Sequence, residues 1–169
     1  MRKRSGTMEQ KMMRLLLEYL KGSKRSDREL AKVVGVSQPT ITRMRQRLVK
    51  EGAIKHFTAI PDFVKMGYEI MAISHVKTKV LEVTELEEKA EKYWKKFPNV
   101  ILVSRAEGMG KNGVLISLHK SYSDYSDFLT ENLREGGDYI QEYETMLINL
   151  KGRIVKPLSL TYLGEQNEA

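Results

Sequence analysis

The chain has 169 residues, a hydrophobic content of 41%, a net charge of +7 and no cysteine. A chain of this length can form one domain or two small ones, and the lack of cysteine excludes disulfides and cysteine-ligated zinc or iron–sulfur sites. No run reaches the roughly 18 apolar residues that a membrane-spanning helix needs, so we expect a cytoplasmic protein with no membrane partner.

The positive charge is concentrated in the first third of the chain. Residues 1–60 hold 15 Lys and Arg against 5 Asp and Glu, whereas residues 61–169 hold 14 against 17. Such asymmetry is typical of a basic domain that binds a polyanion, joined to a domain with another task. We therefore expect one domain at 1–60, a linker at 61–67 and a second domain at 68–169.

Helix-forming patterns open the first domain. Apolar residues recur at helical spacing from Met8 to Tyr19, and Gly22 can end this first helix. The run Ser26-Asp27-Arg28-Glu29 is a capping box that opens a second helix. Gly35 can end that helix in a left-handed conformation.

A third helix can start at Ser37. With Ser37 as the N-cap, Pro39 falls in the first turn, where its missing N–H has no intrahelical partner anyway. The helix is expected to run to about Lys50, and Gly52 ends it. Two helices joined by a tight turn that contains glycine are typical of the helix-turn-helix motif.

The third helix has one apolar and one polar side. At 100° per residue, Ile41 and Leu48 face the core, whereas Arg43 lies opposite and is the best candidate to read bases. Arg47 flanks that side, where phosphates pass, and Arg45 turns back toward the core, where we expect a carboxylate partner. A charged helix face is usually only solvated, but here it has no acidic residue. The predicted DNA-binding residues are Ser37, Gln38, Pro39, Thr40, Thr42, Arg43, Gln46, Arg47 and Lys50, with Lys24, Arg25 and Lys55 as sequence-independent contacts.

The stretch after the third helix alternates between apolar and polar residues. Residues 53–60 therefore predict a strand or short hairpin that serves as a wing, with Lys55 and His56 on the DNA backbone. Pro61 and Asp62 break the pattern and mark the start of the linker.

The second domain alternates strands and helices. A capping box, Thr84-Glu85-Leu86-Glu87, predicts its first helix, and aromatic residues at helical spacing predict its second. The expected order is βαββαβ, which is the ferredoxin-like arrangement, so the chain is assigned to the α+β class. The expected strands are residues 68–78, 100–105, 114–119 and 139–150, followed by a tail strand at 153–163.

Several short motifs occur along both domains: Glu29-Leu30-Ala31, Gly35-Val36-Ser37, Thr40 through Arg43, Arg47-Leu48, Glu51-Gly52-Ala53-Ile54 and Met66-Gly67-Tyr68. In these motifs the chain resembles the Lrp/AsnC family of transcription regulators. The resemblance implies a winged helix-turn-helix joined to a ferredoxin-like domain that dimerises through its sheet and commonly binds an amino acid at subunit interfaces. Double-stranded DNA, a second copy of the chain and an amino-acid effector are thus the expected partners.

The expected effector site departs from the family pattern. Family members usually carry a Gly-x-x-Asp turn between the second and third strands, whereas this chain has a glycine-rich stretch at 108–113 with no aspartate. Gly108, Met109 and Gly110 are the candidate effector-binding residues. The alternative is that these glycines only form a hairpin turn.

Other functions remain as alternatives. One is a nucleoid-like architectural protein with little sequence preference, and another is an enzyme resembling sirohaem decarboxylases. The three histidines lack metal-ligand spacing, and no nucleophile, base and orienting group can be assembled from spacing alone. We therefore expect no enzyme activity, no metal and no cofactor.

Overall fold

The computed structural model describes residues 9–79, 90–136 and 139–165. These residues fall into two compact units. The first, called the headpiece below, contains residues 9–60 and 156–165, and the second, called the sheet unit, contains the described part of 61–155. The sequence pattern predicts a second domain that continues to residue 169, but residues 156–165 belong to the headpiece.

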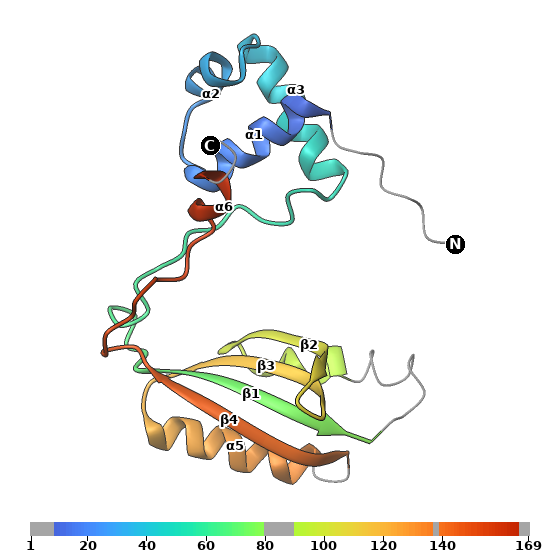
Figure 1. Cartoon of the computed structure of the whole chain (residues 1–169), viewed down its shortest axis with the longest axis vertical. Coiled ribbons are helices and arrows are strands. Elements are labelled where there is room, and N and C mark those ends of the chain that lie inside the picture. Colours follow the sequence, from blue (N-terminus) through green and yellow to red (C-terminus); the bar gives the residue numbers. More distant parts are fainter. Residues whose placement is uncertain (1–8, 80–89, 137–138, 166–169) are drawn as a thin grey trace. The chain divides into compact units, whose positions relative to one another are not determined.

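Three helices form most of the headpiece: α1 (Gln10–Lys21), α2 (Asp27–Val34) and α3 (Gln38–Lys50) (Figure 1). Their apolar sides meet in one core, in which Leu15, Leu30, Ile41 and Leu48 are completely buried. Because α3 contributes two of these four side chains, its apolar side is fixed against α1 and α2 and its polar side faces outward.

The predicted helix ends are confirmed. Ser26 and Glu29 form the reciprocal capping box, and Gly35 ends α2 in the left-handed conformation with φ of 73°. Ser37 is the N-cap of α3, and Pro39 lies in the first turn. The Ser37 hydroxyl bonds to the Thr40 hydroxyl at 2.8 Å and makes no bond to a backbone amide.

The predicted wing strand at 53–60 is wrong for this structure. None of these residues is in a strand, because the described part of the headpiece offers no second strand with which to pair. Two of the apolar residues, Ile54 and Phe57, contact the helices instead. Ile54 is buried and its backbone N–H donates to the Leu48 carbonyl, while Phe57 meets Tyr19 edge to face with ring centroids 5.4 Å apart.

The predicted tail strand at 153–163 is also wrong. Residues 153–160 are irregular, and the chain then forms a short helix, α6 (Thr161–Glu165). Gly164 allows α6 to approach α1 closely: a Cβ on Gly164 would lie 2.8 Å from the Lys21 Cγ and 2.9 Å from the Leu17 carbonyl oxygen. The absence of a side chain at this position therefore lets the C-terminal segment complete the headpiece.

The sheet unit has the predicted βαββαβ order. Its described elements are β1 (Ile70–Thr78), β2 (Val100–Gly108), β3 (Lys111–His119), α5 (Tyr122–Gly136) and β4 (Ile140–Asn149), and residues 90–94 are helical. The strands are ordered β2-β3-β1-β4, with every neighbouring pair antiparallel. This is the α+β arrangement expected from the sequence. The capping box predicted at 84–87 lies outside the described residues.

The two faces of the sheet have different surroundings. The helix α5 lies along one face (Figure 1), where Ala72 and Ser74 are completely buried. Strand residues alternate between faces, so Ile73 points to the other face, called the open face below. There Leu102, Ile116, Ile73 and Met146 are paired in register across all four strands.

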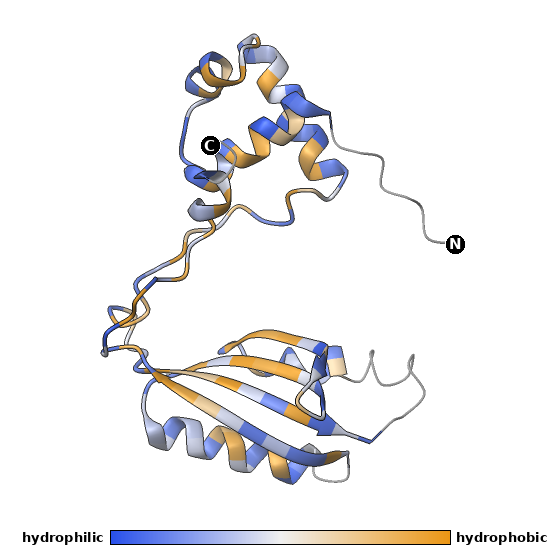
Figure 2. Cartoon of the chain, in the orientation of Figure 1, coloured by the Kyte–Doolittle hydropathy of each residue, from blue (hydrophilic) through white to orange (hydrophobic). Residues whose placement is uncertain are grey.

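The open face carries exposed apolar surface. Leu102 and Met146 are 46% and 63% exposed, and Figure 2 shows apolar residues along β2 and β3. An apolar row across a whole sheet is a surface that another layer commonly covers.

Candidate nucleic-acid interface

The polar side of α3 forms a continuous exposed surface. Ile41 and Leu48 anchor the helix from the buried side, whereas Arg43, Gln46 and Lys50 are exposed. The helix contains no acidic residue, so no charge on it repels a phosphate. Of the predicted α3 residues, the exposed ones are Ser37, Gln38, Pro39, Arg43, Gln46, Arg47 and Lys50, while Thr40 and Thr42 are half-buried.

Four of the predicted cations are available to bind a ligand. Arg43, Lys50, Lys24 and Lys55 are exposed, and no described carboxylate lies within ion-pair distance of any of them. The guanidinium of Arg43 can donate two parallel hydrogen bonds to a base edge or a phosphate. The lysines are suited to point-charge contacts with phosphates.

Arg47 is already paired within the headpiece. Its Nε lies 2.8 Å from a Glu51 carboxylate oxygen and its Nη1 lies 3.0 Å from a Glu9 oxygen. Glu51 and then Glu9 raise the pKa of Arg47 above its ordinary value. All three side chains are exposed, and exposed pairs of this kind exchange partners readily. A phosphate would therefore compete with these two carboxylates for the Arg47 guanidinium.

Arg25 has a different environment from the one expected. Its guanidinium pairs with Glu18, which is only 5% exposed and also accepts from the Lys21 ammonium at 3.0 Å. Burial on its own raises the pKa of Glu18, but the two cations outweigh it, so the net pKa is lowered. The structure therefore uses Arg25 to neutralise a buried carboxylate on α1.

Arg45 has the carboxylate partner that the sequence predicted, and this partner is Asp27 of α2. The same carboxylate accepts a hydrogen bond from the Thr42 hydroxyl at 2.7 Å. The helical pattern of α3 did not predict this second contact. A signal was available, because Asp27 is the acidic residue in the capping box that does not cap the helix itself.

The candidate effector residues form a tight hairpin turn between β2 and β3. Met109 and Gly110 have φ values of 52° and 71°, and Gly108 pairs with Lys111 across the turn. A two-residue turn with both φ values positive matches the twist of the flanking strands. The hairpin reading explains these residues without a ligand.

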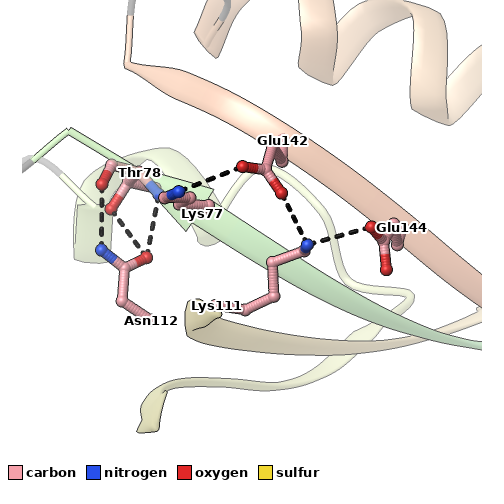
Figure 3. A network of polar contacts seen from close by, with 6 residues as sticks. All are labelled: Lys77, Thr78, Lys111, Asn112, Glu142 and Glu144. Carbon is pink, nitrogen blue, oxygen red and sulfur yellow. Dashed lines mark hydrogen bonds and ion pairs between the residues drawn. The ribbon is translucent and has the colours of Figure 1, made fainter. Parts of the chain in front are cut away.

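The polar groups that follow this turn are bonded to one another (Figure 3). The Lys111 ammonium lies 2.7 Å from Glu142 and 2.9 Å from Glu144, and Lys77 lies 3.1 Å from Glu142. The Asn112 side chain accepts from the Thr78 amide and donates to the Thr78 carbonyl. This network ties β3 to β1 and β4 next to the register shift at Lys77 and Thr78.

The described residues contain no group of three or more His, Asp or Glu side chains that could hold a metal ion. None of their helices is long and apolar enough to cross a membrane.

Comparison with known sequences identifies relatives of this chain. A family model described as winged helix-turn-helix DNA-binding matches residues 8–55. The HTH-type transcriptional regulator FL11 of Pyrococcus furiosus is 33% identical over 81 residues, which are 48% of this chain and 51% of FL11. The chain thus spans about half the length of FL11. The HTH-type transcriptional regulator PH0061 of Pyrococcus horikoshii is 30% identical over 125 residues, which are 72% of this chain and 80% of that one.

Solved structures share the fold over nearly the full chain. The crystal structure of PH0061 superposes with a TM-score of 0.74 at 26% identity and covers 94% of this chain and 99% of its own. An AsnC family transcriptional regulator from Agrobacterium tumefaciens superposes with a TM-score of 0.73 at 20% identity, over 92% of this chain and 99% of that regulator. LrpC from B. subtilis superposes with a TM-score of 0.69 at 24% identity, over 90% of this chain and 100% of LrpC. Sequence match, helix-turn-helix and βαββαβ sheet together place this chain in the Lrp/AsnC family of HTH-type transcriptional regulators.

Proposed function

We propose that the chain is a sequence-specific regulator of transcription that places α3 in the major groove of double-stranded DNA. The observation that carries this proposal is the polar side of α3, where Arg43 and Lys50 are exposed and unpaired among the described residues while the opposite side is locked in the core. An α-helix fits the major groove, and base edges there are read by such donors. DNA as the partner also favours a cytoplasmic location.

The proposal assigns different tasks to the two kinds of exposed side chain. Arg43 and Gln46 reach base edges, because they lie in the middle of the exposed side. The amides at Ser37 and Gln38 bind a phosphate at the positive end of the helix. The remaining cations, Lys24, Lys50, Lys55 and Arg47 after release from its carboxylates, contact the phosphate backbone.

Selection of bound sequences from a random pool of duplex DNA tests this proposal. The full chain is expected to enrich a sequence with two-fold symmetry, since paired recognition helices bind paired half-sites. Failure to enrich any sequence would favour the architectural alternative, which binds DNA through its phosphates. The deciding quantity is the ratio of affinities for the enriched duplex and a scrambled one, measured at one salt concentration.

We propose further that the functional unit is a homodimer in which the open faces of two sheets pack together. The apolar row at Leu102, Ile73, Ile116 and Met146 supports this arrangement, because Leu102 and Met146 are exposed and the two isoleucines are only half-buried. A two-fold dimer uses the same patch on both subunits and presents two copies of α3 to the DNA. Measurement of self-association in a Met146→Lys variant tests this arrangement.

An amino-acid effector is the second candidate for the sheet unit. Its support is the regulator NMB0573 from Neisseria meningitidis, solved as an L-Met complex, which has the same fold with a TM-score of 0.72 at 16% identity. Calorimetric titration of the full chain with each of the twenty amino acids tests this proposal. Heat from one of them that is lost in Met109→Gly would place the site at the 108–110 turn, and no heat from any would contradict it.

The enzyme alternative is tested by an absorbance spectrum of the chain incubated with sirohaem. Under our proposal, the spectrum equals the sum of the two separate spectra and no decarboxylated product forms. A time-dependent spectral change would favour an enzyme built on the same fold.

A further inference from the structure

Asp27 is the first residue of α2, yet its carboxylate bonds to side chains of α3. Two neighbours of Asp27, Ser26 and Glu29, cap the N-terminus of α2. The Ser26 amide donates to a Glu29 carboxylate oxygen at 2.7 Å, and the Glu29 amide donates to the Ser26 hydroxyl at 3.3 Å. The Asp27 carboxylate is therefore free to reach across to the neighbouring helix. There it accepts from the Thr42 hydroxyl at 2.7 Å and pairs with the Arg45 guanidinium.

The two contacts use both oxygens of one carboxylate. Thr42 bonds to Oδ2 and Arg45 to Oδ1, and these residues are three apart on α3, so they lie on the same side of the helix. The Asp27 side chain is 15% exposed, which shields the contacts from water. A carboxylate held at both oxygens fixes direction as well as distance.

The Asp27 contacts restrict the rotation of α3 about its own axis more strictly than the apolar core does. Ile41 and Leu48 hold α3 in the core, but apolar contacts are not directional. A rotation of about 20° about the axis of α3 would move a side chain at the helix surface by about 2 Å, because a helix with its side chains has a radius of about 5–6 Å. Base readout depends on hydrogen bonds within a much narrower range of distances.

Thr42 and Arg45 bracket the proposed base-reading residue. Arg43 follows Thr42 directly, and Gln46 follows Arg45 directly. Fixing the two inward-facing residues therefore fixes the position of the two outward-facing ones. The Asp27 carboxylate also neutralises the Arg45 guanidinium. Arg45 therefore adds no sequence-independent attraction to phosphate.

We infer that Asp27 is a positioning residue for sequence recognition: it sets the rotation of α3 through Thr42 and Arg45 and so determines how Arg43 and Gln46 meet base edges. This inference rests on the proposed function. It adds a specificity-determining residue that does not itself touch DNA.

The test compares two duplexes, one enriched from a random pool by the unchanged chain and one of scrambled sequence. For Asp27→Ala, the ratio of the two affinities is expected to fall by about tenfold, which is the worth of one good base contact. Affinity for the scrambled duplex is expected to stay equal or rise, because Arg45 becomes available to phosphates. Asp127→Ala removes the same charge from an exposed position on α5 and serves as the matched control, for which an unchanged ratio is expected.

Two further variants separate positioning from a general loss of structure. Asp27→Asn keeps an acceptor for Thr42 but loses the charge that holds Arg45, so an intermediate ratio is expected. In an Arg45→Met background, Asp27→Ala should lower the ratio less than it does alone, because part of its effect acts through Arg45. All affinities are measured well below the unfolding midpoint of each variant. If Asp27→Ala does not fold, Asp27→Asn and Arg45→Met carry the test.

The outcomes are distinct. A wild-type ratio near one would contradict the proposed function, and the inference with it. A large wild-type ratio that Asp27→Ala and Asp27→Asn leave unchanged would overturn the inference alone. An equal loss of affinity on both duplexes would also overturn it, since that pattern indicates a general loss of binding competence.

Discussion

Arg43 carries the central prediction at the residue scale. Arg43→Ala should cost about 1–3 kcal/mol of binding free energy on the enriched duplex and relax the preference at one base position. The reason is that its exposed guanidinium has no described internal partner and is the best placed donor for a base edge. Binding assays on the enriched duplex and its single-base variants measure both effects. Equal loss on every duplex would show that Arg43 contacts phosphate only.

Lys24 provides the contrasting case. As an exposed cation outside α3, it is expected to contact phosphate, so Lys24→Ala should weaken binding to all duplexes alike. The slope of log affinity against log salt should fall by about one, because one fewer counterion is released. An unchanged slope would exclude Lys24 from the interface.

His119 predicts a dependence of stability on pH. Its ring is completely buried against Tyr125 and Phe128, and its Nε2 lies 2.8 Å from the Ser117 hydroxyl. Burial lowers the pKa of His119, with Asp124 at 3.8 Å opposing this shift. A histidine with a lowered folded-state pKa stabilises the fold above its unfolded-state pKa of 6.5, and this contribution is lost as the pH falls.

The unfolding midpoint of the sheet unit should therefore drop between about pH 7 and about pH 5, through proton uptake by the unfolded chain. His119→Gln should flatten this part of the curve, and His75→Gln on the open face is the matched control. Thermal unfolding followed by circular dichroism gives the curves. The assignment would be refuted by equal pH dependence in His119→Gln and the unchanged chain.

At the scale of elements, α6 yields a test of the headpiece. Gly164→Val should force α6 away from α1, because the Leu17 carbonyl is backbone and cannot move aside. The expected cost is about 1–3 kcal/mol of unfolding free energy, as for overpacked sites. Denaturant unfolding measures it, and Leu158→Ala in the exposed part of the tail is the control. Equal stability of both variants would mean that α6 contributes nothing.

Local signals in the sequence predicted some elements and missed others. The capping box at Ser26, the left-handed Gly35 and the cap at Ser37 act within a few residues, so the sequence sufficed to place α2 and α3. The strands of the sheet unit were predicted because their pattern repeats with turns between them. The strands predicted at 53–60 and 153–163 are wrong, because alternating residues form a strand only where another strand is available.

The candidate site shows the same limit. Helical periodicity predicts which side of α3 is exposed, and it also predicts that Arg45 needs a carboxylate partner. The pairing of Arg25 with Glu18 and of Arg47 with Glu9 could not be predicted, because those contacts depend on how α1 packs. Helical spacing identifies which cations lie on a face, whereas tertiary packing decides which of them are already neutralised.

At the scale of the whole molecule, the open face of the sheet predicts the assembly. Met146→Lys should weaken self-association by at least tenfold, because it places a charge at the β4 end of the proposed apolar interface. Sedimentation equilibrium measures the dissociation constant, and Val155→Lys, at an exposed position outside the sheet, is the control. Dimers of unchanged affinity in Met146→Lys would exclude this face as the interface.

The return of residues 156–165 to the headpiece has a consequence for synthesis. The ribosome releases α1, α2 and α3 first and α6 only after β4, so the headpiece lacks its last element until the sheet unit has been made. A chain interrupted before α6 therefore carries α3 on a headpiece that lacks the contact between α1 and α6. Under the proposed function, the order of synthesis delays a fully stable DNA-binding unit until the sheet that joins two copies is also present.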